Sequence, residues 1–478
     1  MTLAEKAGMM FINGSHVSDD GSIDIPKQQA GQWDFSQMPS MNAKFQIETH
    51  LMTHFNIWAI PGAMALAAWT NNLQKYAEET RLGIPITIAS DPRNHFSTAI
   101  FEMEARDFSQ WCQPLGFGAV GDPELVRQFA ATAREEYLAA GIRMALHPQV
   151  DLATEPRWPR IGGTFGEDAA LSACLVQAYI EGFQGEQLGP GSVACMTKHF
   201  PGGGPQKEGL DPHFPFHKGQ IYPGGNFEYH LIPFEAAFEA RTAAIMPYYG
   251  VPIGQTDEDV AMAYNHAIIT GLIREKYQFE GVVCTDWGLV TDLVTPAFTW
   301  PARAWGVEDL SEMERVEKII MAGCDQFGGE SCPEHVIELV KNGRISEERI
   351  DQSVRRLLRL QFQLGLFDQP FTDIEQARKV FNRPESIEAG LASQSRAMTL
   401  LKNEEDLLPL LSGGKVFVKN IDRNLAGQYT QVVPSPEEAE LAILRLSTPW
   451  YPVDSDIPLA RDFHHGDLDF KGRELAEI

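Results

Sequence analysis

The stretch EGVVCTDWG, residues 280–288, places a carboxylate at the end of a run that is built like a buried strand. Residues 281–284 are small or β-branched, which is typical of a strand covered on both faces. A carboxylate is costly in such a core unless another group pairs with it or uses it. Enzymes with parallel sheets place their chemistry at the carboxyl ends of these strands. Asp286 is therefore a candidate catalytic residue, although a strand-end Asp is also common as a helix N-cap or loop residue.

A second candidate pair, Lys198 and His199, ends another strand-like run and is followed by three glycines in the sequence TKHFPGGG. Adjacent side chains on a strand point to opposite faces, so a bend must turn both toward one site if they act together. Lys and His supply hydrogen-bond donors suited to hydroxyl-rich or carbonyl ligands. The structural alternative is a surface lysine beside a core histidine.

Three further apolar runs end on side chains that suit an oxygen-rich ligand: Asp91 in IASDPRNH, Arg160 in EPRWPR and Tyr249 in IMPYYG. Each has a plain alternative, such as a turn at Asp91 or a salt-bridged loop at Arg160. In a barrel, however, all five strand ends open on the same face. Carboxylates with Lys, His, Arg and the ring of Trp287, without a metal or phosphate motif, indicate a sugar pocket.

The composition excludes several classes of function. The chain has 478 residues and a formal net charge of −26, which disfavours nucleic acid and anionic membranes because their phosphates would be repelled. No stretch approaches the roughly 20 apolar residues that span a bilayer. The six cysteines form neither a disulfide framework nor a zinc cluster, and no GxGxxG turn follows a strand, so neither a metal nor a cofactor is expected.

The N-terminus lacks the basic segment and long apolar segment of a signal peptide and reads as the first turn of an amphipathic helix. A soluble protein is expected. Its location is periplasmic or secreted if an upstream signal is missing, and cytoplasmic otherwise.

Seven short apolar runs alternate with amphipathic helical patterns over most of the chain, beginning near residues 55, 84, 142, 193, 243, 281 and 323. The helix over 122–141 opens with Asp122 as N-cap and Pro123 at its first position. Strand–helix alternation of this kind predicts an α/β fold with a mainly parallel sheet. The best closed arrangement is a (β/α)8 TIM-type barrel, possibly short of one strand, and a doubly wound open sheet is the alternative.

The domain organisation follows from where this alternation stops. The barrel is predicted over residues 1–370, a polar linker over 371–394, and the start of a second α/β sandwich domain over 395–478. The remainder after residue 413 is roughly 65 residues, few for a free-standing domain, so the chain is expected to stop part-way through it.

Within this second part, three local patterns give expectations. A leucine-rich stretch is expected to cap a second core, through Leu400, Leu401 and residues 407–411. KVFVKN predicts a strand, and SPEEAELAILRL predicts a helix.

In its motifs the sequence resembles glycoside hydrolase family 3, particularly the β-glucosidase branch. The segments that carry the resemblance are KHFPGGG, EPRWPR…GED, GVVCTDWG and the opening MTLAEKAGMMF. It extends in order from residue 1 to about residue 410, where SVRRLLRLQFQLGLFD and TLLKNEEDLLPL fit the family's junction between barrel and second domain.

The resemblance implies a retaining, exo-acting hydrolase that releases glucose from the non-reducing end of a β-linked gluco-oligosaccharide or aryl glucoside. It implies a covalent glycosyl intermediate on Asp286 and an aromatic wall at Trp287. The positions that match the family's sugar-binding and neighbouring residues are Asp91, Arg160, Lys198, His199 and Tyr249.

The proton donor is left open between three candidates. In two-domain relatives it is a glutamate of the second domain, most often beyond the point where this chain ends. In the N-acetylglucosaminidase branch it is a His paired with an Asp two residues away, which Asp211 and His213 match on a longer loop. Glu208 on the same loop is the third. The alternative functions are therefore a β-N-acetylglucosaminidase that uses this dyad, or a non-catalytic sugar-binding fragment.

Overall fold

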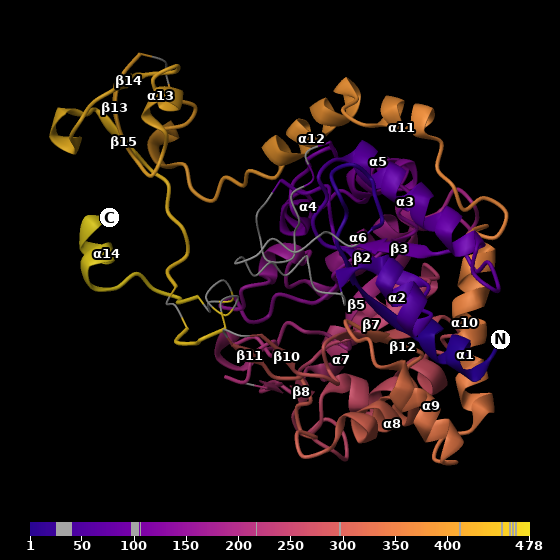
Figure 1. The fold of residues 1–478 in the computed structure, drawn as a ribbon. Helices are drawn as coiled ribbons and strands as arrows, with labels where there is room; N and C mark the ends of the chain where they lie inside the picture. Colours follow the sequence, from indigo (N-terminus) through magenta and orange to yellow (C-terminus); the bar gives the residue numbers. More distant parts are fainter. Residues whose placement is uncertain are drawn as a thin grey trace.

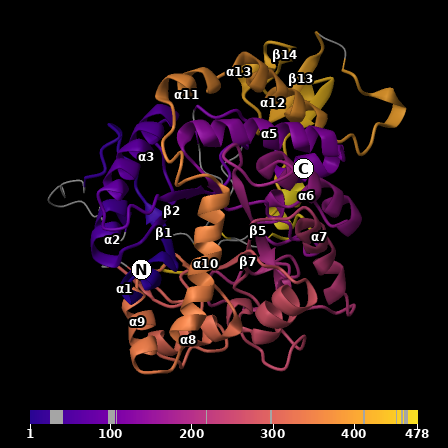
Figure 2. The same cartoon turned by 90° about the vertical axis from the view of Figure 1, so that its right-hand side faces the viewer.

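The computed structural model describes residues 1–24, 41–96, 105, 107–216, 218–295, 298–410, 413–450, 453–457, 460, 463 and 466–478. Figures 1 and 2 show a barrel that carries most of the chain and a smaller C-terminal unit attached to one side of it.

The barrel is closed by eight parallel strands in the order β1-β12-β9-β7-β5-β4-β3-β2. Their bounds are β1 (Phe11–Ser15), β2 (His54–Ile57), β3 (Thr87–Ser90), β4 (Met144–Ala145), β5 (Ala194–Phe200), β7 (Ala244–Pro247), β9 (Val282–Trp287) and β12 (Gln326–Gly328). All seven predicted strands are present, so the (β/α)8 barrel is confirmed and the open sheet is excluded.

The strand that the sequence did not reveal is β1. Its sequence, FINGS, ends on three residues that are poor strand formers, so it lacks the expected apolar alternation. The residues nevertheless pair with β12 on one side and β2 on the other, with Phe11 opposite Phe327 and Ile12 opposite His54. Closure of the barrel stabilises this strand, and the possibility of a missing strand is thereby removed.

Helices surround the strands (Figure 2). They are α1 (Leu3–Met9), α2 (Ala43–His50), α3 (Ala63–Glu78), α4 (Pro114–Val120), α5 (Pro123–Ala140), α6 (Ala169–Gln184), α7 (Phe227–Glu239), a π-helical segment (Ala267–Lys276), α8 (Glu312–Ala322), α9 (Pro333–Lys341) and α10 (Glu347–Gln363). Asp122 caps α5 as predicted, accepting hydrogen bonds from the backbone of Glu124 and Leu125. None of the helices within the described residues is both long and apolar enough to cross a membrane.

Two short paired segments lie beyond the strand ends that form the site. The strands β10 (Leu293–Val294) and β11 (Thr299–Trp300) form an antiparallel pair, and β6 (Gly219–Gln220) pairs with β8 (Val251–Pro252). The β10–β11 pair lies within the loop after β9, and the β6–β8 pair joins the loop after β5 to the loop after β7.

The segment predicted as a polar linker contains two helices, α11 (Ile374–Val380) and α12 (Pro384–Arg396). Both pack against α5, and Arg383 forms an ion pair with Glu135 of that helix at 2.6 Å. The chain therefore stays attached to the barrel over this stretch.

The C-terminal unit contains a parallel sheet of order β14-β13-β15, formed by β13 (Lys415–Lys419), β14 (Gln431–Val432) and β15 (Leu441–Leu444). The strand predicted at KVFVKN is confirmed. The helix predicted at SPEEAELAILRL is wrong: residues 436–438 form one 3-10 turn and LAIL pairs with β13. Pairing with a neighbouring strand outweighs local helix propensity here.

The leucines expected to cap a second core are exposed instead, with 62% of Leu400, 92% of Leu401 and 56% of Leu407 accessible to solvent. Residue 411 lies outside the described residues. In Figure 1 the three-stranded sheet stands away from the barrel, so these side chains have no core to enter.

After β15 the chain returns to the barrel. Phe463, Ala460 and Ile457 pack with Phe214 and Trp300 in a small buried cluster. The Gly466 N–H donates to the Arg157 carbonyl at 2.9 Å. A segment from the far end of the sequence thus lies against the loop that follows β5.

Candidate active site

The two carboxylate oxygens of Asp286 have different surroundings. The Tyr249 hydroxyl and the Trp287 backbone N–H donate to Oδ1 at 2.7 and 2.8 Å. Oδ2 is buried and has no hydrogen-bond partner among the described residues, and its nearest ionisable neighbour is His199 Nε2 at 3.8 Å. One oxygen is therefore held in place while the other is available to react.

Tyr249 remains a donor because burial raises the pKa of its phenol well above the usual value, as does the charge of Asp286. It lies two residues beyond β7, the neighbour of β9 in the barrel. This position explains how a residue 37 positions earlier in the chain reaches the carboxylate.

His199 is oriented by a contact with Asp151, a residue that the sequence analysis did not select. Its Nδ1 lies 2.7 Å from Asp151 Oδ2, and the Gly203 backbone N–H donates to Oδ1 of the same carboxylate at 2.5 Å. Burial lowers the pKa of His199 well below its usual range, so the ring is neutral near pH 7. Asp151 follows an apolar run, the same signal that identified Asp91 and Asp286.

Lys198 and Asp91 form an ion pair, with Nζ 2.9 Å from Oδ1, and Asn56 Nδ2 donates to Oδ2 of Asp91 at 3.2 Å. The register of β5 against β7 is irregular between Lys198 and Phe200. This irregularity brings Lys198 and His199 to one site although they are adjacent, as the sequence analysis required.

Arg160 lies in the loop after β4, immediately before a single turn at residues 161–163. Its guanidinium is buried over the rings of Trp158 and Tyr248, at 6.0 and 5.7 Å. Burial alone would lower its pKa, but the neighbouring Tyr248, Asp211 and Asp286 raise the pKa above its usual value. The arginine is therefore a permanent positive charge within the field of Asp286.

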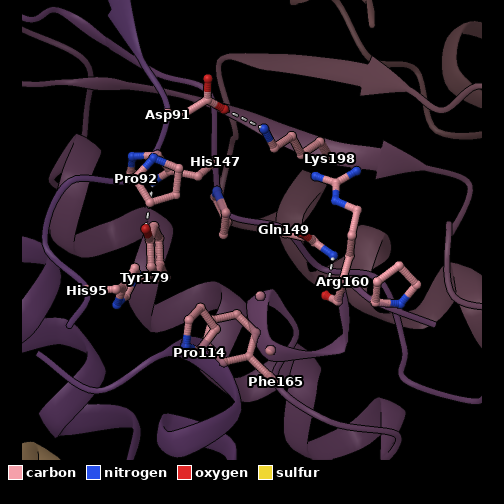
Figure 3. Close-up of a pocket in the computed structure, with 14 residues that line it drawn as sticks. Asp91, Pro92, His95, Pro114, His147, Gln149, Arg160, Phe165, Tyr179 and Lys198 are labelled. Atoms are coloured by element: carbon pink, nitrogen blue, oxygen red, sulfur yellow. Dashed lines mark hydrogen bonds and ion pairs between the residues drawn. The ribbon is translucent and has the colours of Figure 1, made fainter. Parts of the chain in front are cut away.

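A cavity shown in Figure 3 adjoins this group, with Asp91, Lys198 and Arg160 on its wall. The other residues drawn come from neighbouring loops and from helices α4 and α6, including Pro114, His147, Gln149, Phe165 and Tyr179. Asp286 is not among the residues that line this cavity.

Asp211 and His213 form the contact that their spacing suggests. His213 Nδ1 and backbone N–H lie 2.5 and 2.9 Å from Asp211 Oδ1. Trp158 Nε1 and the Tyr248 hydroxyl donate to Oδ2 at 2.7 and 2.8 Å. Burial would raise the pKa of Asp211, but His213 and Arg160 hold it well below its usual value. The carboxylate is ionised and fully hydrogen-bonded.

His213 lies beside Tyr249, the residue that donates a hydrogen bond to Asp286. Its ring is 4.4 Å from the Tyr249 ring and 4.8 Å from the Phe463 ring. Burial lowers the pKa of His213 in spite of the opposing effect of Asp211. Glu208, the third candidate acid, is exposed in the turn before this loop.

Trp287 is half-buried at the end of β9, with Gly328 and Gly329 of the neighbouring strand end packed against its ring. A Cβ at Gly329 would approach Trp287 Cδ1 to 2.5 Å, and this glycine has φ +70°, so no other residue fits without displacing the ring.

Three further residues near the site were not selected in the sequence analysis. Trp300 donates from Nε1 to the His213 carbonyl at 2.8 Å, and Glu330 accepts from the backbone of Val290 at 2.6 Å. Arg303 is 93% buried beside Tyr249. Arg303 lies in an irregular loop and Trp300 in the two-residue strand β11, where no apolar run marks a residue, but Glu330 stands two residues beyond β12 and carried the strand-end signal. Within the described ranges no three His, Cys, Asp or Glu side chains are grouped so as to hold a metal ion.

The chain is similar over its whole given length to known proteins. Beta-glucosidase C of Emericella nidulans is 47% identical over 487 residues, covering 100% of this chain and 76% of the relative. The periplasmic beta-glucosidase/beta-xylosidase of Dickeya chrysanthemi is 37% identical, covering 98% of this chain and 73% of the relative.

A solved β-glucosidase from Listeria innocua in complex with glucose superposes with a TM-score of 0.71 at 22% identity, covering 94% of this chain and 59% of that one. At this identity the likeness supports the fold alone, and the chain spans little more than half of that protein. The model of the glycosyl hydrolase family 3 N terminal domain matches residues 52–360. With this match and full-length similarity at 47% identity, the chain belongs to glycosyl hydrolase family 3.

Proposed function

We propose that this protein is a retaining, exo-acting β-glucosidase with Asp286 as its nucleophile. The observation that carries the proposal is the asymmetry of the Asp286 carboxylate, with Oδ1 held by two donors and Oδ2 buried without a hydrogen-bond partner among the described residues. The most similar relatives named above are β-glucosidases, which favours glucose over the N-acetylglucosaminidase alternative. Nothing in the comparisons favours a non-catalytic fragment.

The substrate is a β-glucoside, either an oligosaccharide or an aryl glucoside, bound through its non-reducing sugar. In a barrel of order β1-β12-β9-β7-β5-β4-β3-β2, β3 lies opposite β9. Asp91 follows β3 and Asp286 ends β9, so one pyranose ring spans the site between them. The Asp91–Lys198 pair closes the end remote from Asp286, which suits hydrolysis from the chain end.

In the first step Oδ2 of Asp286 attacks the anomeric carbon, the glycosidic C–O bond breaks, and the departing oxygen takes up a proton. In the second step water attacks the same carbon, gives up a proton, and the Asp286 carboxylate is released. Arg160 and Lys198 hold hydroxyls of the ring in both steps, and Trp287 lies along the sugar's apolar face.

We assign proton transfer to His213, supported by Asp211. The neutral ring is a base for the water of the second step, with Nδ1–H donated to Asp211 and Nε2 as the acceptor. As an acid in the first step, His213 acts only in its protonated form. The protonated fraction is small near neutral pH because the pKa of His213 is lowered, and it rises as the pH falls. Poor leaving groups should therefore depart faster at mildly acidic pH.

The test is covalent labelling with 2,4-dinitrophenyl 2-deoxy-2-fluoro-β-glucoside, followed by peptide mass spectrometry. The good leaving group permits the first step and the fluorine slows the second, so the glycosyl ester accumulates. The label is expected on the peptide that contains Asp286. A label on any other carboxylate would overturn the assignment. Rates on aryl β-glucoside and aryl β-N-acetylglucosaminide, measured side by side, separate the two sugars.

A further inference from the structure

Arg303 is a buried positive charge that acts on Asp286, Glu330 and Asp211 only through space: burial lowers its pKa, and these carboxylates oppose the shift. Only 7% of the residue is exposed, and its Nε is buried without a hydrogen-bond partner among the described residues. Its Nη1 contacts the Gly288 carbonyl at 3.5 Å, the outer limit for a hydrogen bond. No carboxylate in the described part of the chain forms an ion pair with this guanidinium. Removing a charge from water in this way is unfavourable unless a binding partner compensates the lost hydration.

Other buried arginines of the barrel form short hydrogen bonds, although Arg93 Nη1 and Arg143 Nε are, like Arg303 Nε, buried without a partner among the described residues. Arg93 donates from Nε to the Ser90 hydroxyl at 2.7 Å, and Arg143 donates from Nη2 to the Leu364 carbonyl at 2.6 Å. Both have short contacts with oxygen atoms that belong to the scaffold. Arg303 differs from them in that the only hydrogen bond of its side chain among the described residues is the 3.5 Å contact with the Gly288 carbonyl.

The guanidinium is nevertheless held in one orientation. Its carbon lies 3.9 Å from the centre of the Trp300 ring and 5.7 Å from that of Tyr249. Stacking at 3.9 Å fixes the plane of the fork. Gly288 has φ +69°, and a Cβ there would lie 2.4 Å from Arg303 Nη1, so this glycine makes room for the arginine.

The location of Arg303 in the barrel indicates which part of a bound glucoside it would face. It follows β11 in the loop after β9, whereas Asp91 follows β3, the strand opposite β9, and Lys198 of β5 is paired with Asp91. A sugar held by Asp91 and Lys198, with its anomeric carbon at Asp286, directs its substituent toward the β9 loops. Arg303 is therefore on the side where the departing group lies.

We propose that Arg303 is a specificity-determining residue that binds the carboxylate of an acidic aglycone, as in a β-glucoside of a phenolic acid. A guanidinium with an unused edge matches a carboxylate in geometry, and such charge-assisted pairs are among the strong hydrogen bonds. A carboxylate supplies a directly paired counter-charge, which the described residues do not, whereas a neutral hydroxyl adds no charge. The inference rests on the proposed β-glucosidase function.

The experiment compares kcat/KM for 3-carboxyphenyl β-glucoside and for its methyl ester, two substrates of the same shape that differ in charge. An ionic strength of about 0.2 M screens the long-range repulsion from the acidic protein surface. The wild type is expected to favour the acid by about 10-fold or more, the worth of one charge-assisted bond. Arg303→Met, which keeps the apolar stem, is expected to bring the ratio of acid to ester near 1. Arg303→Lys should retain part of the preference because it keeps the charge but not the fork.

Lys218→Met is the matched control. Lys218 lies 4.7 Å from the Trp305 ring on the same side of the barrel, but it is already paired with Glu308 and more exposed. Its removal subtracts the same charge and should leave the acid-to-ester ratio as in the wild type. Melting temperatures establish that each variant is folded.

Two results would overturn the proposal: a wild-type ratio at or below 1, or an equal loss on acid and ester in Arg303→Met. The second would mean that the guanidinium acts only through the field it exerts on Asp286. If the wild type hydrolyses neither glucoside, the β-glucosidase function itself fails, which is a separate outcome.

Discussion

The two sides of the active site are built differently. The strand-end floor consists of Asp91, Lys198, His199, Tyr249 and Asp286, each within a barrel strand or within two residues of its end. The loop wall consists of residues 211–216 and 298–305 together with Phe463, which join through Trp300 and the aromatic cluster. The floor is fixed by backbone pairing between neighbouring strands, whereas the wall depends on contacts between loops that are far apart in sequence.

This difference teaches where chemistry and selectivity reside. In the proposed function the floor supplies the nucleophile and the groups that hold the sugar, on positions that the barrel cannot move without breaking strand pairs. The wall supplies His213 and Arg303, which we propose face the departing group. Loops can vary without unfolding the barrel, so the wall is where family members can differ in the aglycone they accept.

The largest effect is expected when the reactive carboxylate of the floor, Asp286, is removed. Asp286→Ala is expected to lower kcat on 2,4-dinitrophenyl β-glucoside by about 10⁴-fold or more, because no other carboxylate can form the ester. Steady-state rates measure this loss, and Asp257→Ala, an exposed acid, serves as the control. Residual activity above about 1% of wild type would place the nucleophile elsewhere.

A smaller effect is expected at the wall. Asp211→Asn removes the charge that supports His213 and leaves fewer acceptors for Trp158 and Tyr248. We expect kcat/KM to fall about 10²- to 10³-fold on an alkyl β-glucoside, the usual worth of general acid–base catalysis. The fall should be smaller on the dinitrophenyl glucoside, whose leaving group needs no proton. Equal losses on both substrates would count against proton transfer by the dyad.

The smallest effect is expected in the stability of the fold, at Glu330, which holds the start of the loop after β9. Glu330 accepts hydrogen bonds from the backbone of Val290 and Thr291 and from the Thr291 hydroxyl, just beyond Asp286. Burial raises the pKa of Glu330 from 4.5 to about 7, although these hydrogen bonds oppose the shift. The folded protein therefore holds this proton more tightly than the unfolded chain between pH 4.5 and about 7.

The stability that comes from protonated Glu330 is thus present at low pH and is lost as pH rises toward 7, by about 3 kcal/mol at most. Glu330→Gln cannot titrate, so its stability should fall less between pH 5 and pH 7.5 than that of the wild type. Urea unfolding at the two pH values measures the difference between the proteins, which cancels the other titrating groups. Parallel pH profiles for the two would show that Glu330 does not titrate in this range.

Local sequence patterns were sufficient for much of the fold. Seven strands and the caps of helix α5 follow from apolar periodicity, an N-cap Asp and a terminal Gly, all of which act over a few residues. The floor was accessible for the same reason, since a polar residue after a buried run is visible in the sequence alone. Asp151 carries that signal too and was overlooked.

Other features were decided by contacts between distant residues. The strand β1 exists because β12 and β2 pair with it, and the strand β15 because β13 does. Lys198 meets Asp91 across 107 positions, and Phe463 reaches His213 from the far end of the chain. Neither contact could be predicted from a local sequence pattern.

The sequence by itself determined the barrel's repeating units and which strand ends carry reactive groups, because these depend on short-range propensity and on the burial pattern of each strand. Only the tertiary structure decided which oxygen of Asp286 lacks a hydrogen-bond partner, and that Arg303 is buried without an ion pair, within the part of the chain that the structure describes. Both depend on what surrounds a side chain in three dimensions, and that environment is assembled from loops whose packing no local rule specifies.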